Sequence, residues 1–385
     1  MNHRFGLPRR STARVTFRAP QVRPGGFKPL PDPTGEYPFR MPLRSILEPA
    51  HYQSIVRSGR LVFHTAGDLG GIRDSIPQER VADALERDFP PDDAPLHDRP
   101  AFFYVLGDCV YFNGEASQYY LQFYHPYEHY PAAVVAVAGN HDGDNVGHET
   151  SLEAFVRNLC APEPGLHSPD AGDSVRTRMT QPNVYWTLTS DLINIVGLYS
   201  NVPSGGRLGD PQRQWLVHEL KTLPKRVPIA VTLHHPPFSA DTSHGGSDRM
   251  RQEIDTAAKA AGRIPDLVLA GHVHAYERFT RRRSNGDEYP YIVAGAGGYH
   301  NLHPIARPRG RALMLPTAVK VGGDTISLEN YKDDRHGFLR MEVTKDAIVG
   351  NYFTVPRPHE SWSQGARLFE MWRYDLRTRK VSLGS

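Results

Sequence analysis

The chain has 385 residues, 39% of them hydrophobic, which is enough for one large domain or two smaller ones. Lys and Arg number 45 against 42 Asp and Glu, and a net charge of +3 is too small to indicate nucleic acid or an anionic membrane as a partner. No apolar run approaches the roughly 18 residues that span a bilayer, and two cysteines cannot form a disulfide framework.

Residues 1–42 read as a basic, proline-rich arm. Residues 1–40 contain eight Lys or Arg, two acidic residues and seven prolines. Because proline removes backbone donors and blocks regular helix, we expect an irregular segment. The arm lacks the apolar stretch of a secretory signal, so the sequence as written predicts a cytoplasmic protein, or a secreted or periplasmic one if a leader has been removed.

Residues 43–350 alternate short apolar runs with amphipathic stretches, which is typical of buried strands and helices in an α/β domain. The predicted strands are Leu61–Ala66, Ala101–Leu106, Ala132–Ala138, Pro228–Leu233 and Pro265–Ala270. The predicted helices are Pro77–Phe89, Ser151–Leu159, Pro211–Leu220 and Ser247–Ala261. A hairpin is expected over Asn183–Ser200, with later strands at Tyr291–Gly295, Gly337–Val343 and Ile348–Phe353.

Residues 351–385 form a predicted C-terminal extension. Apolar and polar residues alternate over Ala366–Leu383, and this pattern favours a β-hairpin. The hairpin could extend a sheet edge or form an oligomer contact, and the sequence leaves both alternatives open.

Polar side chains follow each of the first five predicted strands. The motifs are Asp68-Leu69-Gly70, Gly107-Asp108-Cys109-Val110-Tyr111, Gly139-Asn140-His141-Asp142, His234-His235-Pro236 and Gly271-His272-Val273-His274. Each motif alone is also typical of a turn or a helix cap. Sites in open α/β sheets lie just beyond the carboxyl ends of strands, so the ordered set of five predicted strand ends indicates a shared site.

The donor types in this set indicate metal ions. Asp68, Asp108 and Tyr111 offer anionic oxygens, and the remaining donors are the amide of Asn140 and the imidazoles of His234, His272 and His274. Crowded carboxylates raise each other's pKa unless cations compensate them. Seven donors with one bridging carboxylate give four contacts to each of two metals, and such a pair is suited to displacement at phosphorus.

These motifs resemble those of the calcineurin-like metallophosphoesterases, and more narrowly those of the purple acid phosphatases. The resemblance covers roughly residues 60–350 and rests on the five motifs in order, continued by Ala275-Tyr276-Glu277-Arg278. It implies a four-layer α/β/β/α sandwich. The wider superfamily usually has histidine where this chain has Gly70, whereas Tyr111 stands where that superfamily seldom has a phenol.

The resemblance also implies roles for the donors. Fe³⁺ would be held by Asp68, Asp108, Tyr111 and His274, and a divalent Fe, Zn or Mn ion by Asn140, His234 and His272, with Asp108 bridging. A phenolate donor favours the trivalent ion. His141 and His244 would be the catalytic, substrate-contacting histidines, although His244 also reads as an ordinary loop histidine. His235 is a neighbour of the ligand His234, and it would either support the ligands or have no role.

The expected activity is that of an acid phosphatase that hydrolyses phosphate monoesters by attack of a metal-bound hydroxide and releases inorganic phosphate. A phosphodiesterase or nucleotide hydrolase on the same core is the alternative, and a non-catalytic metal-bound scaffold is a third interpretation. Phosphorylated small molecules or other phosphoesters are the expected partners, without nucleic acid or membrane.

Overall fold

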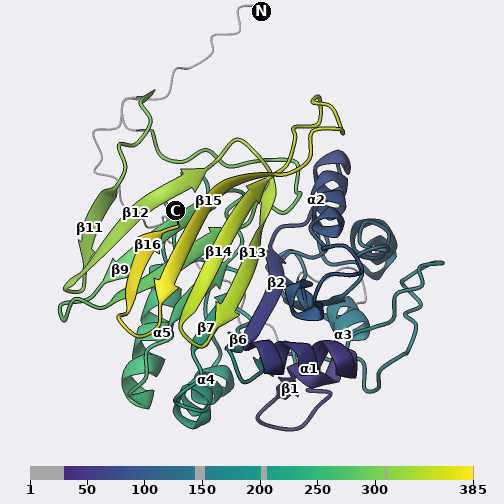
Figure 1. Ribbon diagram of the computed structural model, residues 1–385, viewed down its shortest axis with the longest axis horizontal. Helices are drawn as coiled ribbons and strands as arrows, with labels where there is room; N and C mark the ends of the chain where they lie inside the picture. Colours follow the sequence, from purple (N-terminus) through teal and green to yellow (C-terminus); the bar gives the residue numbers. More distant parts are fainter. Residues whose placement is uncertain (1–29, 144–151, 201–205, 308–309, 385) are drawn as a thin grey trace, which may run out of the picture.

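The computed structural model describes residues 30–143, 152–200, 206–307 and 310–384. Within this part of the chain the strands form two sheets (Figure 1). The seven-stranded sheet has the order β16-β15-β14-β13-β2-β3-β4 and the nine-stranded sheet the order β1-β5-β6-β7-β8-β10-β9-β12-β11.

The bounds of the strands are as follows. The seven-stranded sheet contains β2 (Arg60–Ala66), β3 (Phe102–Leu106), β4 (Ala133–Val137), β13 (Gly337–Thr344), β14 (Ala347–Thr354), β15 (Arg367–Asp375) and β16 (Lys380–Leu383). The nine-stranded sheet contains β1 (Arg40–Pro42), β5 (Trp186–Thr189), β6 (Asn194–Gly197), β7 (Ile229–Leu233), β8 (Leu267–Ala270), β9 (Tyr276–Arg282), β10 (Glu288–Ala294), β11 (Thr317–Val321) and β12 (Asp324–Lys332).

The hydrophobic core lies between the two sheets. Tyr104 of β3 is fully buried, and its hydroxyl accepts a hydrogen bond from Thr232 of β7 at 2.8 Å. The indole Nε1 of Trp186 in β5 donates to the carbonyl of Ala136 in β4 at 3.1 Å. These buried polar atoms are satisfied across the interface, so they fix how one sheet faces the other.

Helices cover the outer side of each sheet. They are α1 (Pro49–Ser58), α2 (Ile76–Arg87), α3 (Glu153–Leu159), α4 (Asp210–Thr222) and α5 (Asp248–Ala261). In Figure 1, α1, α2 and α3 lie beside β2, and α4 and α5 lie together near β6 and β7. Glu219 of α4 pairs with Arg40 of β1 at 2.8 Å. The α/β/β/α order predicted from the resemblance is therefore the order of the layers.

The sequence predicts four of these helices to within a few residues. Ser247 caps α5 by accepting a hydrogen bond from the backbone N–H of Met250, and the predicted hairpin forms between β5 and β6. The elements without a prediction are β1, α1, β9, β11 and β12. None of the helices in the described ranges is both long and apolar enough to cross a membrane.

The two predicted extensions differ from the structure in detail. Residues 1–29 of the basic arm lie outside the described residues, but the end of the range 1–42 contains β1, which pairs in parallel with β5. The predicted division at residue 350 falls inside β14. The strands β15 and β16 pair with each other, and β15 pairs with β14, so the C-terminal residues extend the seven-stranded sheet.

The five strands that precede the polar motifs belong to two parallel groups. β2, β3 and β4 are parallel neighbours in one sheet, and β7 and β8 are parallel neighbours in the other. The carboxyl ends of both groups meet, because the backbone N–H of His272 after β8 donates to Asp68 Oδ2 after β2 at 2.7 Å. The site predicted at strand ends therefore lies where the two sheets meet rather than at the edge of one sheet.

Candidate metal centre

Tight turns bring the donor residues to the ends of their strands. Asp68, Asp108 and His272 have φ angles of 59°, 52° and 69°, in the left-handed region that side-chain-bearing residues seldom adopt. Such conformations persist where the surrounding structure holds them, and they cluster at functional sites. Gly107, with φ of 92°, leaves room for His234, because a Cβ at residue 107 would lie 2.5 Å from the imidazole Nδ1.

A first group of three donors surrounds one point. The Tyr111 hydroxyl lies 3.2 Å from Asp68 Oδ1 and 3.3 Å from His274 Nε2, and His274 Nε2 lies 3.4 Å from Asp68 Oδ1. Bonds of about 2.0–2.2 Å to a common cation separate tetrahedral ligands by about 3.3–3.6 Å. The three donor atoms are therefore spaced as ligands of a single ion.

A second group adjoins the first. His234 Nε2 lies 3.0 Å from Asn140 Oδ1, 3.2 Å from His272 Nδ1 and 3.2 Å from Asp108 Oδ2. The same nitrogen is 4.0 Å from Asp68 Oδ1, so the two groups touch. The structure thus brings together all seven donors that the sequence predicts: one group contains Asp68, Tyr111 and His274, and the other contains Asp108, Asn140, His234 and His272.

Backbone carbonyls orient two of the imidazoles. His234 Nδ1 donates to the carbonyl of Leu106 at 2.9 Å, and His274 Nδ1 donates to the carbonyl of Asn301 at 2.7 Å. Because a carbonyl can only accept, each ring carries a proton on Nδ1 and directs its Nε2 at the other donors. Metal-binding histidines are commonly held in this way.

Asp142 joins the turns that follow β3 and β4. Its carboxylate accepts hydrogen bonds from the backbone N–H groups of Cys109, Val110 and Gly139 at 2.8–3.1 Å. Burial, followed by the charge of Asp108, raises the pKa of Asp142 to about 6. The residue stands in the predicted motif after β4, but the sequence assigned it no role, because nothing local shows that it reaches the turn after β3.

The charges of the centre call for a cation. Burial and the neighbouring carboxylates of Asp108 and Asp68 raise the pKa of Tyr111 well above that of an ordinary phenol. Burial lowers the pKa of His234, but the charges of Asp108 and Asp68 outweigh burial and raise it to about 9. In the described part of the chain, both carboxylates have only histidines as ion-pair partners. The donor set therefore fits metal ions, which would neutralise the carboxylates and ionise the phenol.

Gly70 explains why no imidazole stands where the wider superfamily usually has one. The residue has φ of 81°, and a Cβ on it would overlap the backbone of Tyr299 and lie 2.8 Å from the carbonyl carbon of Gly298. Tyr299 in turn stacks on the ring of Tyr111, with centroids 4.1 Å apart. The space beside Asp68 is thus filled by backbone and by Tyr299, which the sequence did not indicate.

The remaining predicted histidines lie around the donors. His141 is half-buried; its backbone N–H donates to Asp108 Oδ1 at 2.9 Å, and its Nδ1 donates to the carbonyl of Phe112 at 2.6 Å. The ring of His244 is exposed and lies 4.4 Å from that of His272. His235 is buried with its ring 4.4 Å from that of His272.

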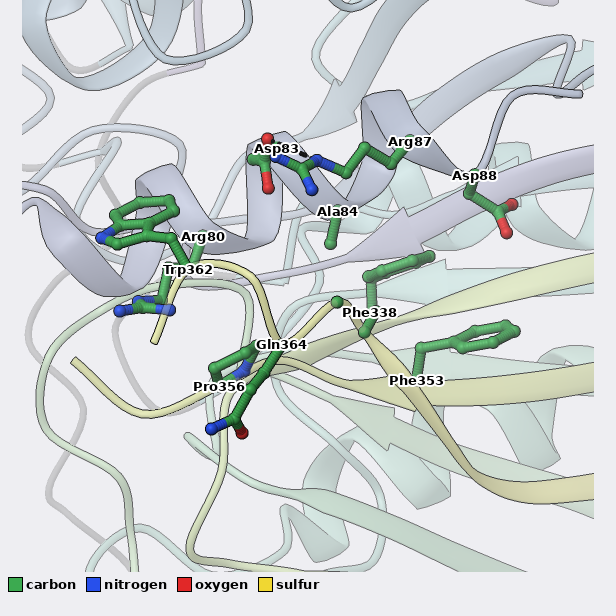
Figure 2. A pocket seen from close by; sticks show the side chains of 12 residues that line it. Arg80, Asp83, Ala84, Arg87, Asp88, Phe338, Phe353, Pro356, Trp362 and Gln364 are labelled. Carbon is green, nitrogen blue, oxygen red and sulfur yellow. Dashed lines mark hydrogen bonds and ion pairs between the residues drawn. The ribbon is translucent and has the colours of Figure 1, made fainter. Parts of the chain in front are cut away.

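A cavity of about 240 Å³ lies elsewhere, between α2 and the segment that joins β14 to β15 (Figure 2). None of the seven donors lines it. Arg80 stands beside Trp362 there, 4.2 Å from the indole centroid, and donates to the carbonyls of Pro358 and Glu360. These contacts hold the connecting segment against α2. The cavity is separate from the candidate metal centre, because its lining contains none of the donors.

Comparison with known proteins bears out the resemblance. The family model of calcineurin-like phosphoesterases matches residues 63–276, which is more than half of the chain. The chain belongs to the calcineurin-like phosphoesterase family. The matched range contains the five strand-end motifs and stops within the Ala275-Tyr276-Glu277-Arg278 continuation.

Among family relatives, the chain resembles purple acid phosphatases. It is 33% identical over 211 residues to probable purple acid phosphatase 20 of Arabidopsis thaliana, which covers 48% of this chain and 47% of that protein. The chain thus spans about half the length of this relative.

Two solved structures share the fold. One is purple acid phosphatase PPD1 of yellow lupin, with TM-score 0.55 and 14% identity over 82% of this chain and 53% of that one. The other is GAP50, the anchor in the inner membrane complex of Plasmodium, with TM-score 0.53 and 15% identity over 85% of this chain and 90% of that one.

Proposed function

We propose that this metallophosphoesterase is an acid phosphatase that hydrolyses phosphate monoesters of small molecules at a dinuclear metal centre. The observation that carries the proposal is the spacing of the seven donors, which fall into two adjoining groups with neighbouring donor atoms 3.0–3.4 Å apart. Fe³⁺ in the group of Tyr111 and a divalent ion in the group of Asn140 fit the donor types, because phenolate is a hard anionic ligand.

Two cations held by these residues would supply positive charge for the phosphate oxygens and would lower the pKa of a water molecule. Asp108 would bridge the two ions. Tyr111 and Asp68 would balance the higher charge of the first ion, whereas Asn140, His234 and His272 would leave the second site with neutral donors. The seven donors are fixed to the ends of rigid strands, so the site keeps its geometry without substrate.

His141 is placed to handle the proton of the leaving group. Its Nδ1 is engaged by the carbonyl of Phe112, so its Nε2 is the nitrogen that can donate to the departing oxygen. His141→Ala is expected to lower kcat for an alkyl phosphate by about 10²–10⁴-fold, the usual contribution of a general acid. The metal content should not change, because the side chain is not among the donors.

A leaving-group series checks this role. For para-nitrophenyl phosphate, whose leaving group needs little protonation, the loss in His141→Ala should be much smaller than for the alkyl ester. An equal loss with both esters would contradict proton donation by His141 and indicate a role in binding alone.

The preference for monoesters is tested by comparing para-nitrophenyl phosphate with its bis-ester. The two cations balance the dianionic monoester better than the monoanionic diester, so kcat/KM is expected to favour the monoester by at least about tenfold, a difference of about 1.4 kcal/mol. A higher kcat/KM for the bis-ester would assign the centre to phosphodiester hydrolysis instead.

A further inference from the structure

A second group of metal-ligating side chains lies beside the candidate metal centre. Asp241, His244 and His303 each offer one donor atom, and the three atoms lie within 4.8 Å of one another. His244 Nδ1 lies 3.2 Å from His303 Nδ1, and Asp241 Oδ2 lies 3.7 Å and 3.6 Å from these two nitrogens. None of the three belongs to the seven donors described above.

These distances match the edges of a tetrahedral metal site. Zinc bonds of about 2.0–2.2 Å to imidazole nitrogen and carboxylate oxygen separate neighbouring ligand atoms by about 3.3–3.6 Å, and the three observed distances lie within about 0.1 Å of this range. The two rings are stacked nearly parallel, at 15°, so their Nδ1 lone pairs lie in separate planes and meet at one ion only when the His244 ring turns about its Cβ–Cγ bond. That side chain is 38% exposed, which leaves it room to turn and leaves a fourth coordination position open.

The charges around Asp241 leave room for a cation. Its side chain is fully buried, and that of His303 is 5% exposed. In the ranges that the structure describes, His244 and His303 are the ion-pair partners of Asp241, and no Lys or Arg reaches it. His303 Nδ1 accepts the backbone N–H of His274 in a long hydrogen bond of 3.4 Å, so this nitrogen carries the lone pair that a metal ligand needs, and an ion would replace that contact.

The two loops that carry the three residues are pinned together. Asp241 forms an isolated β-bridge with Ile305, and the backbone N–H of Ala306 donates to the carbonyl of Ala240 at 2.8 Å. The buried carboxylate of Glu277 accepts the backbone N–H of Ala240 at 2.7 Å. The group therefore does not depend on one flexible loop, and its geometry is preorganised for a ligand.

We propose that Asp241, His244 and His303 form a third metal site that binds Zn²⁺. Two imidazoles and one carboxylate form a borderline donor set that suits zinc rather than Mg²⁺ or Ca²⁺. Binding through Nδ1 leaves the Nε2 of His244 free to face substrate. The site is distinct from the dinuclear centre, because no donor is shared between them.

The test measures metal stoichiometry after the purified protein is equilibrated with excess Zn²⁺ and passed over a desalting column. Elemental mass spectrometry should give three metal ions per chain for the wild type, and two for Asp241→Asn and for His303→Ala. Asp241→Asn preserves the size of the side chain and removes its charge. His300→Ala removes a half-buried histidine of the same loop outside the group, and this matched control should retain three ions.

Titration with Zn²⁺ against a chromophoric chelator measures the affinity of the third site. Asp241→Asn should weaken it by more than about 100-fold, the upper end of the effect of losing an outer partner of a metal ligand. Two ions in the wild type, or three in both variants, would overturn the proposal and leave the dinuclear centre standing. One ion in the wild type, lost in both variants, would support this site and contradict the dinuclear centre.

Discussion

Asp108→Asn is expected to release the metals of the dinuclear centre and to lower kcat on para-nitrophenyl phosphate by about 1,000-fold or more. The Asp108 carboxylate lies 3.2 Å from His234 Nε2, and in the proposed centre it would bridge the two ions. Asparagine has the same shape but cannot bridge two cations with a negative charge. Metal-assisted charge stabilisation is worth several kcal/mol in such centres, and about 4 kcal/mol corresponds to this loss.

The measurement combines element analysis with kcat, and circular dichroism verifies that the variant is folded. Asp83→Asn is a matched control, because Asp83 lies on the surface of α2, pairs with Arg87 and is remote from the seven donors. The control should retain its metals and its activity. An Asp108→Asn variant that keeps both metals and turns over normally would refute the bridge.

Tyr111→Phe is expected to abolish the visible absorption of the iron-loaded protein completely. The phenol oxygen is fully buried and within 3.3 Å of both Asp68 and His274, and charge transfer from a tyrosinate to Fe³⁺ would produce the colour. Phenylalanine preserves the stacking on Tyr299 and removes only the oxygen. Turnover should fall less than in Asp108→Asn, on the order of 10–100-fold, as is typical when the surroundings of a metal are weakened.

Tyr299→Phe serves as the matched control for the spectrum. Its ring stacks on Tyr111 at 4.1 Å, but its oxygen is not among the donors. This variant should retain the absorption band at nearly the same wavelength. A band that survives in Tyr111→Phe and disappears in Tyr299→Phe would contradict this account, because the iron-bound tyrosinate would then be Tyr299.

The donor residues were predictable because their signals are local. Each donor motif lies directly after a short apolar run, and glycine precedes several of the turns. The strand, the turn and the ligand can therefore be recognised from one short stretch of sequence. Even so, the sequence did not reveal that the strands before Asp68 and His272 belong to different sheets. Pairing between distant strands depends on contacts that no local pattern records.

The strand β9 shows why other elements were missed. Its sequence is rich in charge, yet six of its seven residues are buried. Arg281 pairs with Asp255 of α5 and Asp324 of β12, at 2.6 and 2.7 Å, and such partners come from parts of the chain far away in sequence. A charged stretch with unknown partners reads as an exposed surface, because burial of a charge requires its pair.

The same reasoning applies to Asp241 and His303. They occupy irregular loops where no periodicity identifies them, and their proximity results from the pairing of two segments about 60 residues apart. Asp142 stands in a recognisable motif, but two of its hydrogen-bond donors, Cys109 and Val110, lie in the turn after β3, so its role could not be inferred from a local pattern either.

The most direct test of the dinuclear centre is element analysis of the freshly purified protein together with its visible absorption spectrum. The centre described here predicts one iron and one further divalent metal in the group of seven donors, with a visible band that depends on Tyr111. Protein that binds no iron when it is supplied, or that binds Fe³⁺ and remains colourless, would contradict it.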